Sequence, residues 1–246
     1  MTVRIAGPRD ALSVGKLNEA HATIESALRL GARDGSGALI AYSGGKDGLV
    51  VALLAQEHGV TEGACEVSFC FDRQVADIRA TAERLGFNVT YREQLSYGWL
   101  REHPQHIFAR DTGLVSVLCQ RRQIASFERV AAERGARVIF TGRKRRGNSV
   151  KQAVYEKGAF VMAHPLACWD DGDVWTFLRD RGVARPWVYD TVFGRREGNS
   201  AWPFYRESAD AATCWRAIYD TGVECVERAS AAGIQGAVDC LARADG

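Results

Sequence analysis

The stretch ALIAYSGGKDG at residues 38–48 decides the fold. Residues 38–42 form a short apolar run with glycines on either side, and such a run is typical of a buried strand. A loop with two consecutive glycines follows, and residues 48–58 predict a helix. A strand, a glycine-rich loop and a helix in this order are the beginning of an α/β unit.

The same alternation of strands and helices continues along the chain. Strands are predicted at residues 66–71, 88–91 and 138–140, and helices at residues 75–85 and 121–134. Gly86 and Gly135 each follow a predicted helix, where glycine adopts the left-handed capping conformation at least cost. The pattern predicts the α/β class, with a three-layer, doubly wound and mostly parallel sheet.

Further elements are predicted on both sides of this alternating region. Residues 10–30 have the period of an amphipathic helix, and residues 170–181 predict a helix whose cap is Asp170 or Asp171. We expect a hairpin around Lys157 and Gly158, no regular structure at residues 182–206, and a helical C-terminal tail at residues 209–242, broken at Gly222 and Gly233. No flexible linker separates these parts, so we expect a single domain over residues 1–246.

The composition favours a cytoplasmic protein with a proper core. Of the 246 residues 46% are hydrophobic, and 32 Lys and Arg against 30 Asp and Glu give a net charge of +2. A nucleic-acid partner is therefore not indicated by net charge, although it stays open. No signal peptide is recognisable at the N-terminus and no run approaches the ~20 apolar residues of a membrane span, so we expect no membrane partner. The seven cysteines are scattered without a CxxC spacing, which favours a reducing compartment.

The loop at residues 43–47 has the chemistry of an anion site. Gly44 and Gly45 allow backbone N–H groups to approach a ligand, and the following helix adds unpaired N–H groups and the positive end of its dipole. Ser43 supplies a hydroxyl donor and Lys46 a charge suited to phosphate. Asp47 would repel phosphate unless it holds a cation, so we interpret it as a Mg²⁺ ligand or a water-orienting group. The alternative is a plain turn with solvated charges.

A second candidate anion site follows the predicted strand at residues 138–140. Residues 143–146 are all Arg or Lys, and they follow the carboxyl end of a strand, where open α/β sheets bind ligands. Four adjacent cations repel one another and are stabilised by an anion. The alternative is a solvated basic loop.

Four segments resemble known families. SGGKDG at residues 43–48 resembles the PP-loop signature SGGxDS of the adenine nucleotide α-hydrolase-like superfamily, with Gly48 in place of a serine hydroxyl. Three segments resemble motifs of the phosphoadenylyl-sulfate (PAPS) reductase family: CQRRQ at residues 119–123 its Cys-Cys-x-x-Arg-Lys run, TGRKRRGNS at residues 141–149 its T-G-x-R-x-x-x-S loop, and HPLACWDDGDVW at residues 164–175 its N-P-L-x-x-W-x-x-x-D-V-W signature. Strict alignment puts Lys144 at the arginine of the family's T-G-x-R motif, and we expect Arg143 or Arg145 to hold that role.

The resemblance implies a Rossmann-like PP-loop domain with a nucleotide-binding core at about residues 38–193. ATP or a related adenylyl nucleotide is the implied ligand, with Mg²⁺ at Asp47. We expect Lys46, Asp47 and Arg143 to be catalytic. The expected nucleotide-binding residues are Tyr42, Ser43, Gly44, Gly45, Lys46, Asp47, Gly48, Asp72, Thr141, Gly142 and Arg143.

The cysteines depart from the family pattern. Adenylyl-sulfate reductases hold a four-iron cluster with a Cys-Cys pair and a later CxxC, whereas here Cys119 follows Leu118, so we expect no iron-sulfur cluster. The reductive Glu-Cys-Gly-Leu-His segment is also absent, because neither Cys225 nor Cys240 is followed by Gly and His. We interpret all seven cysteines as small buried hydrophobes.

Three functions are compatible with these features. The first is attack at the α-phosphate of the nucleotide, which releases pyrophosphate and adenylylates an acceptor that the sequence does not identify. In this family such activation often serves sulfur chemistry. The second is thiol-dependent reduction of phosphoadenylyl sulfate to sulfite, with Cys240 or Cys225 as nucleophile and thioredoxin as reductant. The third is a nucleotide-sensing or partner-binding protein without catalysis.

Overall fold

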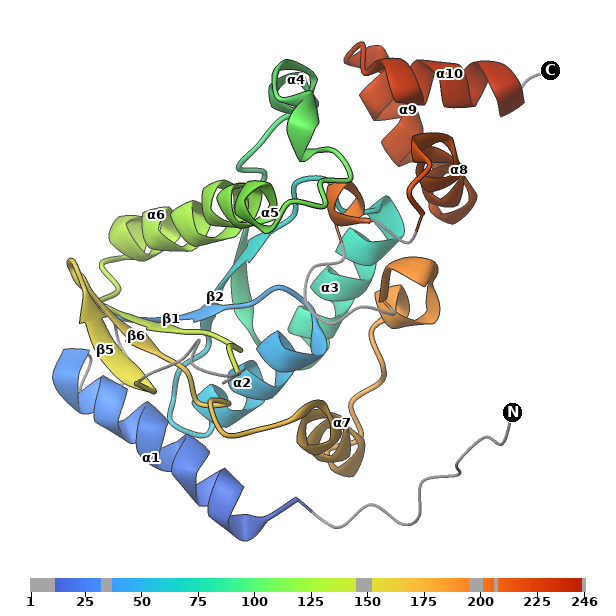
Figure 1. The fold of residues 1–246 in the computed structure, drawn as a ribbon. Coiled ribbons are helices and arrows are strands. Elements are labelled where there is room, and N and C mark those ends of the chain that lie inside the picture. The colour runs from blue at the N-terminus through green and yellow to red at the C-terminus, as the bar shows by residue number, and fades with distance from the viewer. Residues whose placement is uncertain (1–11, 32–36, 145–151, 195–200, 206–207, 245–246) are drawn as a thin grey trace. The chain divides into compact units, whose positions relative to one another are not determined.

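The structure is a computed structural model that describes residues 12–31, 37–144, 152–194, 201–205 and 208–244 (Figure 1). The chain divides into two compact units. The first comprises residues 1–63 and 131–185, and the second comprises residues 64–130 and 186–246. The single domain expected from the sequence stays a prediction.

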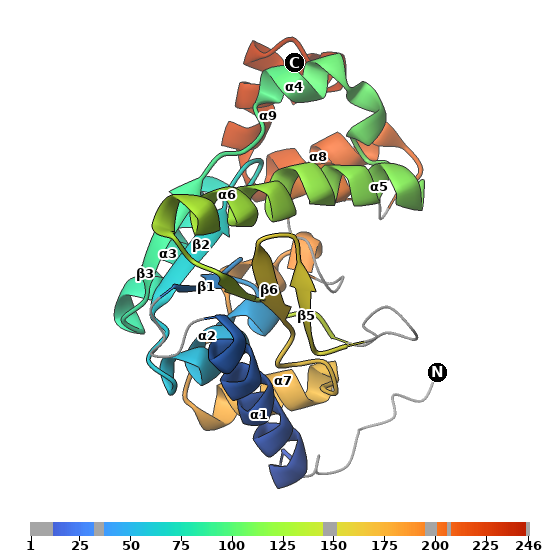
Figure 2. The ribbon, with the colours of Figure 1, turned by 90° about the vertical axis from the view of Figure 1, so that its left-hand side faces the viewer.

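The strands follow one another in the order β3-β2-β1-β4-β6-β5. The strands β1, β4 and β6 are parallel, with Ile40 in register with Phe140 and Phe140 in register with Ala163. The last two strands form the predicted hairpin and are antiparallel (Figure 2). The predicted α/β class with a mostly parallel sheet is therefore confirmed. The strands are β1 (Ala38–Ala41), β2 (Glu62–Glu66), β3 (Asn88–Arg92), β4 (Val138–Phe140), β5 (Val154–Lys157) and β6 (Phe160–Ala163).

The described part of the first unit also contains the helices α1 (Val14–Gly31), α2 (Lys46–Gln56) and α7 (Asp171–Asp180). The helix α1 buries its apolar stripe, which includes Ile24 and Ala27, against β4 and β6. The helix α2 is buried from residue 48 to residue 55, and it packs on β1 and α7. The predicted cap of α7 is confirmed, because Asp170 accepts the Asp173 N–H in a capping box.

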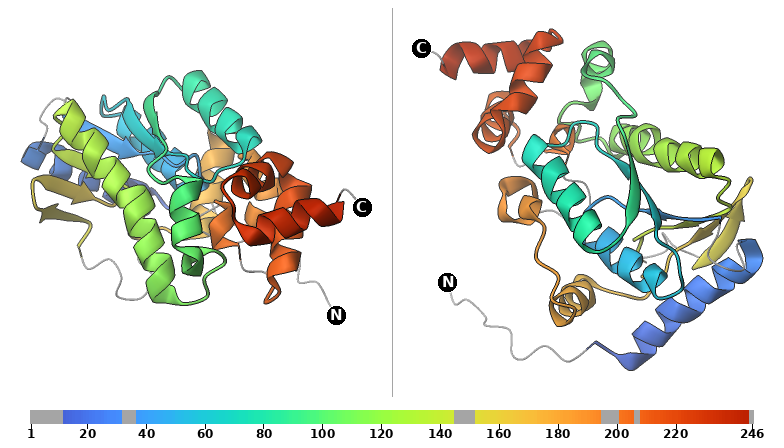
Figure 3. Two further views of the ribbon diagram at one scale, coloured as in Figure 1. Left: turned by 90° about the horizontal axis from the view of Figure 1, so that it is seen from above. Right: turned by 180° about the vertical axis from the view of Figure 1, so that it is seen from behind.

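The second unit is mainly helical. Its C-terminal helices α8, α9 and α10 pack on one another (Figure 3). The helical tail is interrupted at Gly222 and near Gly233, as predicted. Short 3₁₀ turns lie at residues 104–106, 187–190, 192–194 and 202–204. The helices are α3 (Asp72–Arg84), α4 (Tyr97–Glu102), α5 (Thr112–Cys119), α6 (Ala125–Arg134), α8 (Ala211–Thr221), α9 (Val223–Ala231) and α10 (Gln235–Ala244), with a π-helical segment at Gln120–Ile124.

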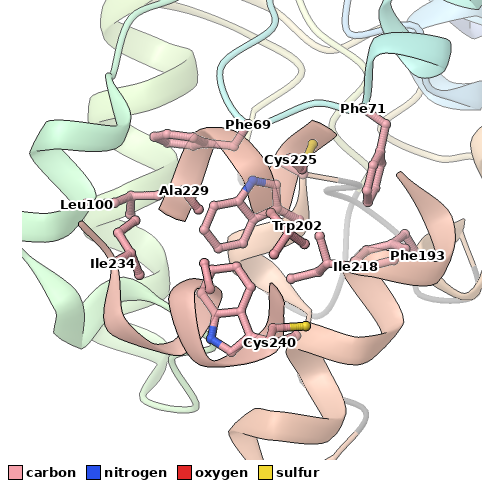
Figure 4. Close-up of a cluster of buried hydrophobic side chains, with 14 of the residues drawn as sticks. Phe69, Phe71, Leu100, Phe193, Trp202, Ile218, Cys225, Ala229, Ile234 and Cys240 are labelled. Carbon is pink, nitrogen blue, oxygen red and sulfur yellow. The ribbon is translucent and has the colours of Figure 1, made fainter. Parts of the chain in front are cut away.

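An aromatic cluster forms the core of the second unit (Figure 4). Trp202 is fully buried at its centre, with ring centroids 5.0 Å from Trp215 and 5.9 Å from Phe69. Ile218 of α8 and Ala229 of α9 close the cluster, so the apolar faces of the C-terminal helices are buried here. This burial stabilises helices that would be marginal in isolation.

Several element boundaries differ from the sequence-based prediction. The prediction of a strand at residues 66–71 is wrong, because β2 ends at Glu66. Residues 67–71 form a buried turn in which Phe69 has a φ of 62°. The helices α2 and α3 begin earlier than predicted. The helix predicted at residues 121–134 begins instead at Thr112, where Asp111 caps it, and Cys119 lies within this helical stretch.

A buried ion pair holds the turn that follows β2. Arg122 of the π-helical segment pairs with Glu66, and both side chains are almost completely excluded from solvent. The guanidinium also donates from Nε to the carbonyl of Ser68 at 2.9 Å and from Nη2 to Sγ of Cys70 at 3.3 Å. Burial raises the pKa of Glu66, although the charge of Arg122 opposes that rise. The pair is therefore costly to desolvate and costly to break.

Removal of the Arg122 charge should destabilise the protein strongly. We expect Arg122→Met to lower the free energy of unfolding by about 3–5 kcal/mol, because Glu66 is left as an uncompensated buried charge. The double variant Arg122→Met/Glu66→Leu should recover most of this loss. Urea unfolding measures both. Arg134→Met is the control, since it breaks an exposed pair with Glu62 and should cost about 1 kcal/mol or less.

Candidate nucleotide-binding site

The loop between β1 and α2 has the backbone geometry of an anion site. Gly44 adopts a φ of 69°, a left-handed conformation that favours glycine. Gly45 is the N-cap of α2 and no side chain caps it, so no capping oxygen covers the first amides of the helix. Ser43 stays beside the loop and accepts the Gly45 N–H at 3.4 Å. Unpaired N–H groups at the start of a helix favour an anion, and the phosphate site that the sequence places here stays a prediction.

Two lysines and two aspartates form a compact charge cluster at this loop. The Lys46 ammonium is 3% exposed and lies 3.4 Å from Oδ2 of Asp47 and 3.1 Å from Oδ1 of Asp171. The Lys144 side chain is 8% exposed, and its ammonium lies 2.9 Å from Oδ1 of Asp47 and also contacts Asp171. Each ammonium therefore bridges the same two carboxylates. The four side chains come from the first turns of α2 and α7 and from the segment after β4.

Glycine at position 142 allows the segment after β4 to approach α2. A Cβ atom at Gly142 would lie 2.7 Å from Cβ of Asp47 and 2.9 Å from its carbonyl carbon. Real Cβ atoms essentially never come so close to backbone. The absence of a side chain therefore lets the Thr-Gly segment lie directly against Asp47.

His164 of the segment after β6 supports the same segment. Its Nδ1 lies 2.7 Å from the hydroxyl of Thr141, and that hydroxyl also accepts the Arg143 N–H at 3.4 Å. The imidazole is buried, and burial followed by the charge of Arg143 lowers the pKa of His164 to about 4. The residue is therefore neutral at physiological pH, and it holds Thr141 by a hydrogen bond rather than by a charge.

The first unit brings together most of the residues that the sequence predicts for the site. The loop at residues 43–48 meets Gly142 through Asp47, and Tyr42 is buried at the end of β1. Arg143 is exposed, whereas its neighbour Lys144 takes the inward position. Asp72 belongs to the second unit, where it is the first residue of α3 and accepts Arg228 Nη2 at 2.7 Å. Arg145 and Arg146 lie outside the described residues.

Sequence reasoning missed three members of this arrangement. Lys144 lies where strict alignment places the family's arginine, but from the sequence we expect Arg143 or Arg145 in that role. Asp171 was considered only as a helix cap, and its approach to Lys46 and Lys144 is a tertiary contact without a local signal. His164 stands where the family motif has asparagine, and that departure was its only signal.

The cysteines differ in burial, and the described residues form no metal-ligand cluster. Cys65, Cys70, Cys214, Cys225 and Cys240 are buried, whereas Cys119 and Cys168 are half-buried. Within the described ranges, no three His, Cys, Asp or Glu side chains are grouped so that they could hold a metal ion. None of the helices in the described part of the chain is long and apolar enough to span a bilayer.

Comparison with known proteins gives the family. The sequence matches the phosphoadenosine phosphosulfate reductase domain over residues 37–195. The chain therefore belongs to this family of PP-loop proteins. No curated protein sequence matches the chain.

Solved structures match the chain at low sequence identity and with TM-scores below 0.5. A phosphoadenylyl-sulfate reductase from Candida auris in a phosphate complex is 14% identical, with a TM-score of 0.49 over 74% of this chain and 94% of that one. An FMN adenylyltransferase from Candida glabrata, in complex with FMN and an ATP analogue, is 13% identical, with a TM-score of 0.47 over 85% and 80%. Yeast FAD synthetase in complex with FAD is 12% identical, with a TM-score of 0.46 over 71% and 61%.

The lowered pKa of His164 predicts an acid-sensitive site. The unfolded chain binds the proton with a pKa near 6.5 and the folded chain only near 4, so stability falls as the pH drops from about 6.5 to 4. The full difference corresponds to roughly 3 kcal/mol. We expect His164→Asn, which cannot titrate, to flatten this part of the stability profile measured by urea unfolding. If His164→Asn left the pH profile of stability unchanged, titration of His164 would not be its cause.

Proposed function

We propose that this protein binds ATP or a related adenylyl nucleotide on the loop at residues 43–48 and reacts at its α-phosphate. An acceptor attacks the α-phosphorus, the bond to the bridging oxygen breaks, and pyrophosphate leaves with the electron pair of that bond. The acceptor keeps the adenylyl group. In this family such activation often serves sulfur chemistry, so sulfur transfer is the reaction class that we propose for the adenylylated acceptor.

The cluster of Lys46, Lys144, Asp47 and Asp171 carries this proposal. Desolvating two ammonium groups costs several kcal/mol. A turn that only joins a strand to a helix does not require buried ammonium groups. Both groups lie beside the uncapped start of α2, where backbone N–H groups and the helix dipole favour a phosphate. Developing negative charge on the α-phosphate and on the leaving pyrophosphate would therefore meet two preorganised cations.

The residues present also fit a magnesium ion. Asp47 and Asp171 offer carboxylate oxygens, the ligands that Mg²⁺ prefers, and both contact the same ammonium of Lys144. Mg²⁺ is typically held by one or two carboxylates together with substrate phosphates. When bound, it would neutralise phosphate charge, and Asp47 is the residue that we expect to hold it.

Burial of the thiols counts against the reductase alternative. Cys225 is buried in α9, and its thiol lies 3.6 Å from the carbonyl oxygen of Cys70. Burial raises the pKa of Cys225 to about 12, and it also raises the pKa of Cys240. Because the thiolate is the nucleophile, both thiols are poorly suited to attack sulfur at neutral pH.

A nucleotide-sensing or partner-binding protein without catalysis is the third candidate, and Gly48 in place of the family's serine favours it.

One pair of assays separates these functions. We expect pyrophosphate release from ATP and Mg²⁺ with candidate acceptors that include thiols and sulfide, and no sulfite release from phosphoadenylyl sulfate with reduced thioredoxin. Sulfite as the main product would replace the proposal with the reductase. Nucleotide binding without turnover in either assay would leave the sensing function.

The two buried lysines should dominate nucleotide affinity. We expect Lys46→Ala and Lys144→Ala each to weaken ATP binding by roughly 1.5–3 kcal/mol, the range for hydrogen bonds to charged groups. Isothermal titration calorimetry measures the affinity, and circular dichroism checks that the fold is intact. Arg143→Ala tests the neighbouring position, because the Arg143 side chain is exposed beside Lys144 and the sequence also predicts that Arg143 binds the nucleotide. A larger loss of affinity in Arg143→Ala than in Lys144→Ala would make Arg143, and not Lys144, the main cation of this segment.

A further inference from the structure

The second unit contains a pocket that the proposed function does not use. Its volume is about 440 Å³, within the range of small-molecule sites. Asp72, Val75, Ala76 and Arg79 form one wall, and their spacing places them on a single face of α3. The segment after β3 forms a second wall with Glu93, Leu95, Ser96 and Tyr97, and Arg228 of α9 completes the lining.

The floor of the pocket is a turn that costly interactions hold in place. Residues 67–70 form this floor, and Phe69 in it adopts a φ of 62°, which is uncommon for a residue other than glycine. The buried Arg122 donates to Ser68 and Cys70, and Oε1 of Glu66 accepts the Ser68 N–H at 2.8 Å. Strained backbone and buried charge that meet in one turn are typical of a functional site.

The same interactions connect the floor to the second wall. The Ser68 hydroxyl accepts the Leu95 N–H at 3.0 Å, and Oε1 of Glu66 also lies 3.4 Å from the Gln94 N–H. Floor and wall are therefore fixed to each other before any ligand arrives. A preorganised pocket loses less conformational entropy when it binds, so small ligands gain affinity.

Charges of both signs surround the opening. Asp72 and Arg228 neutralise each other, with 2.7 Å between Oδ1 and Nη2. The Arg79 guanidinium lies 4.6 Å from the centroid of the Tyr91 ring. In the described part of the chain, neither Arg79 nor Glu93 forms an ion pair. The pocket therefore presents one cation from α3 and one anion from the segment after β3, with apolar side chains between them.

We propose that this pocket binds a small zwitterion of the α-amino-acid class with an apolar side chain. Its carboxylate pairs with Arg79 and its ammonium group with Glu93. Its side chain packs on Val67, Val75 and Leu95, which line the pocket. The proposed ligand contacts use only residues of the second unit. Asp72, which the sequence assigns to the nucleotide, lines the pocket but is paired with Arg228 and contacts neither of the ligand's charged groups.

Thermal denaturation of the full chain tests the class of ligand. We expect apolar amino acids such as L-leucine, L-valine and L-methionine at about 10 mM to raise the thermal midpoint, because they bind the folded state. Two analogues of leucine separate the charges: 4-methylpentanoate lacks the ammonium group and 3-methylbutylamine lacks the carboxylate. Neither should raise the midpoint. A shift by either analogue equal to that of leucine would overturn the zwitterion, and no shift by any amino acid would overturn the proposal.

Paired variants test the residues. We expect Arg79→Gln and Glu93→Gln each to weaken the binding of the amino acid about tenfold or more in calorimetry, a change of about 1.4 kcal/mol or more. Arg84→Gln and Glu83→Gln are the controls, because both residues are exposed on α3 and do not line the pocket. Equal effects in variants and controls would overturn the assignment. Protection by ATP with loss in Arg79→Gln, and without any amino-acid signal, would assign the pocket to the nucleotide instead.

Discussion

The close approach of Gly142 to Asp47 is the constraint on which the candidate site depends. β1 and β4 are parallel neighbours with Ile40 in register with Phe140, so both strands end at the same edge of the sheet. The chain after β4 must then pass the first turn of α2, and only a residue without Cβ fits there. Lys144 follows two positions later, which brings its ammonium to the carboxylate of Asp47. The glycine thus decides where a distant cation lies.

The charge cluster has no net charge, and this property governs how it can exchange ligands. Each lysine already contacts two carboxylates, so an incoming phosphate competes with Asp47 and Asp171 for the same ammonium groups. A free nucleotide would leave both carboxylates beside its own negative charge, which is unfavourable in a partly buried site. A nucleotide that binds together with Mg²⁺ places a cation beside the two carboxylates when its phosphates pair with the two lysines. The cluster is therefore better matched to a metal complex of the nucleotide than to the nucleotide alone.

Local patterns in the sequence were sufficient for the fold and for the glycine loop, and insufficient for the contacts between segments. The run at residues 38–42 and the glycines after α3 and α6 are local signals, and they predicted the strand β1 and the C-terminal ends of the two helices. The apolar run at residues 67–71 is buried as predicted, but burial alone does not distinguish a strand from a turn packed in the core. Asp171 resembles a capping residue in sequence, because nothing nearby reveals the two lysines that it meets.

The arginine in the segment around Cys119 has a structural role of its own. In the family's Cys-Cys-x-x-Arg-Lys pattern, Leu118 replaces the first cysteine, and Arg122 stands at the arginine. That arginine is buried against Glu66 and fixes the turn after β2 through Ser68 and Cys70. The role of Arg122 does not require a metal cluster, because its partners are a carboxylate, a carbonyl and a thiol of the protein. The arginine can therefore be explained by the support that it gives to the β2 turn, whatever chemistry the cysteines serve in other members.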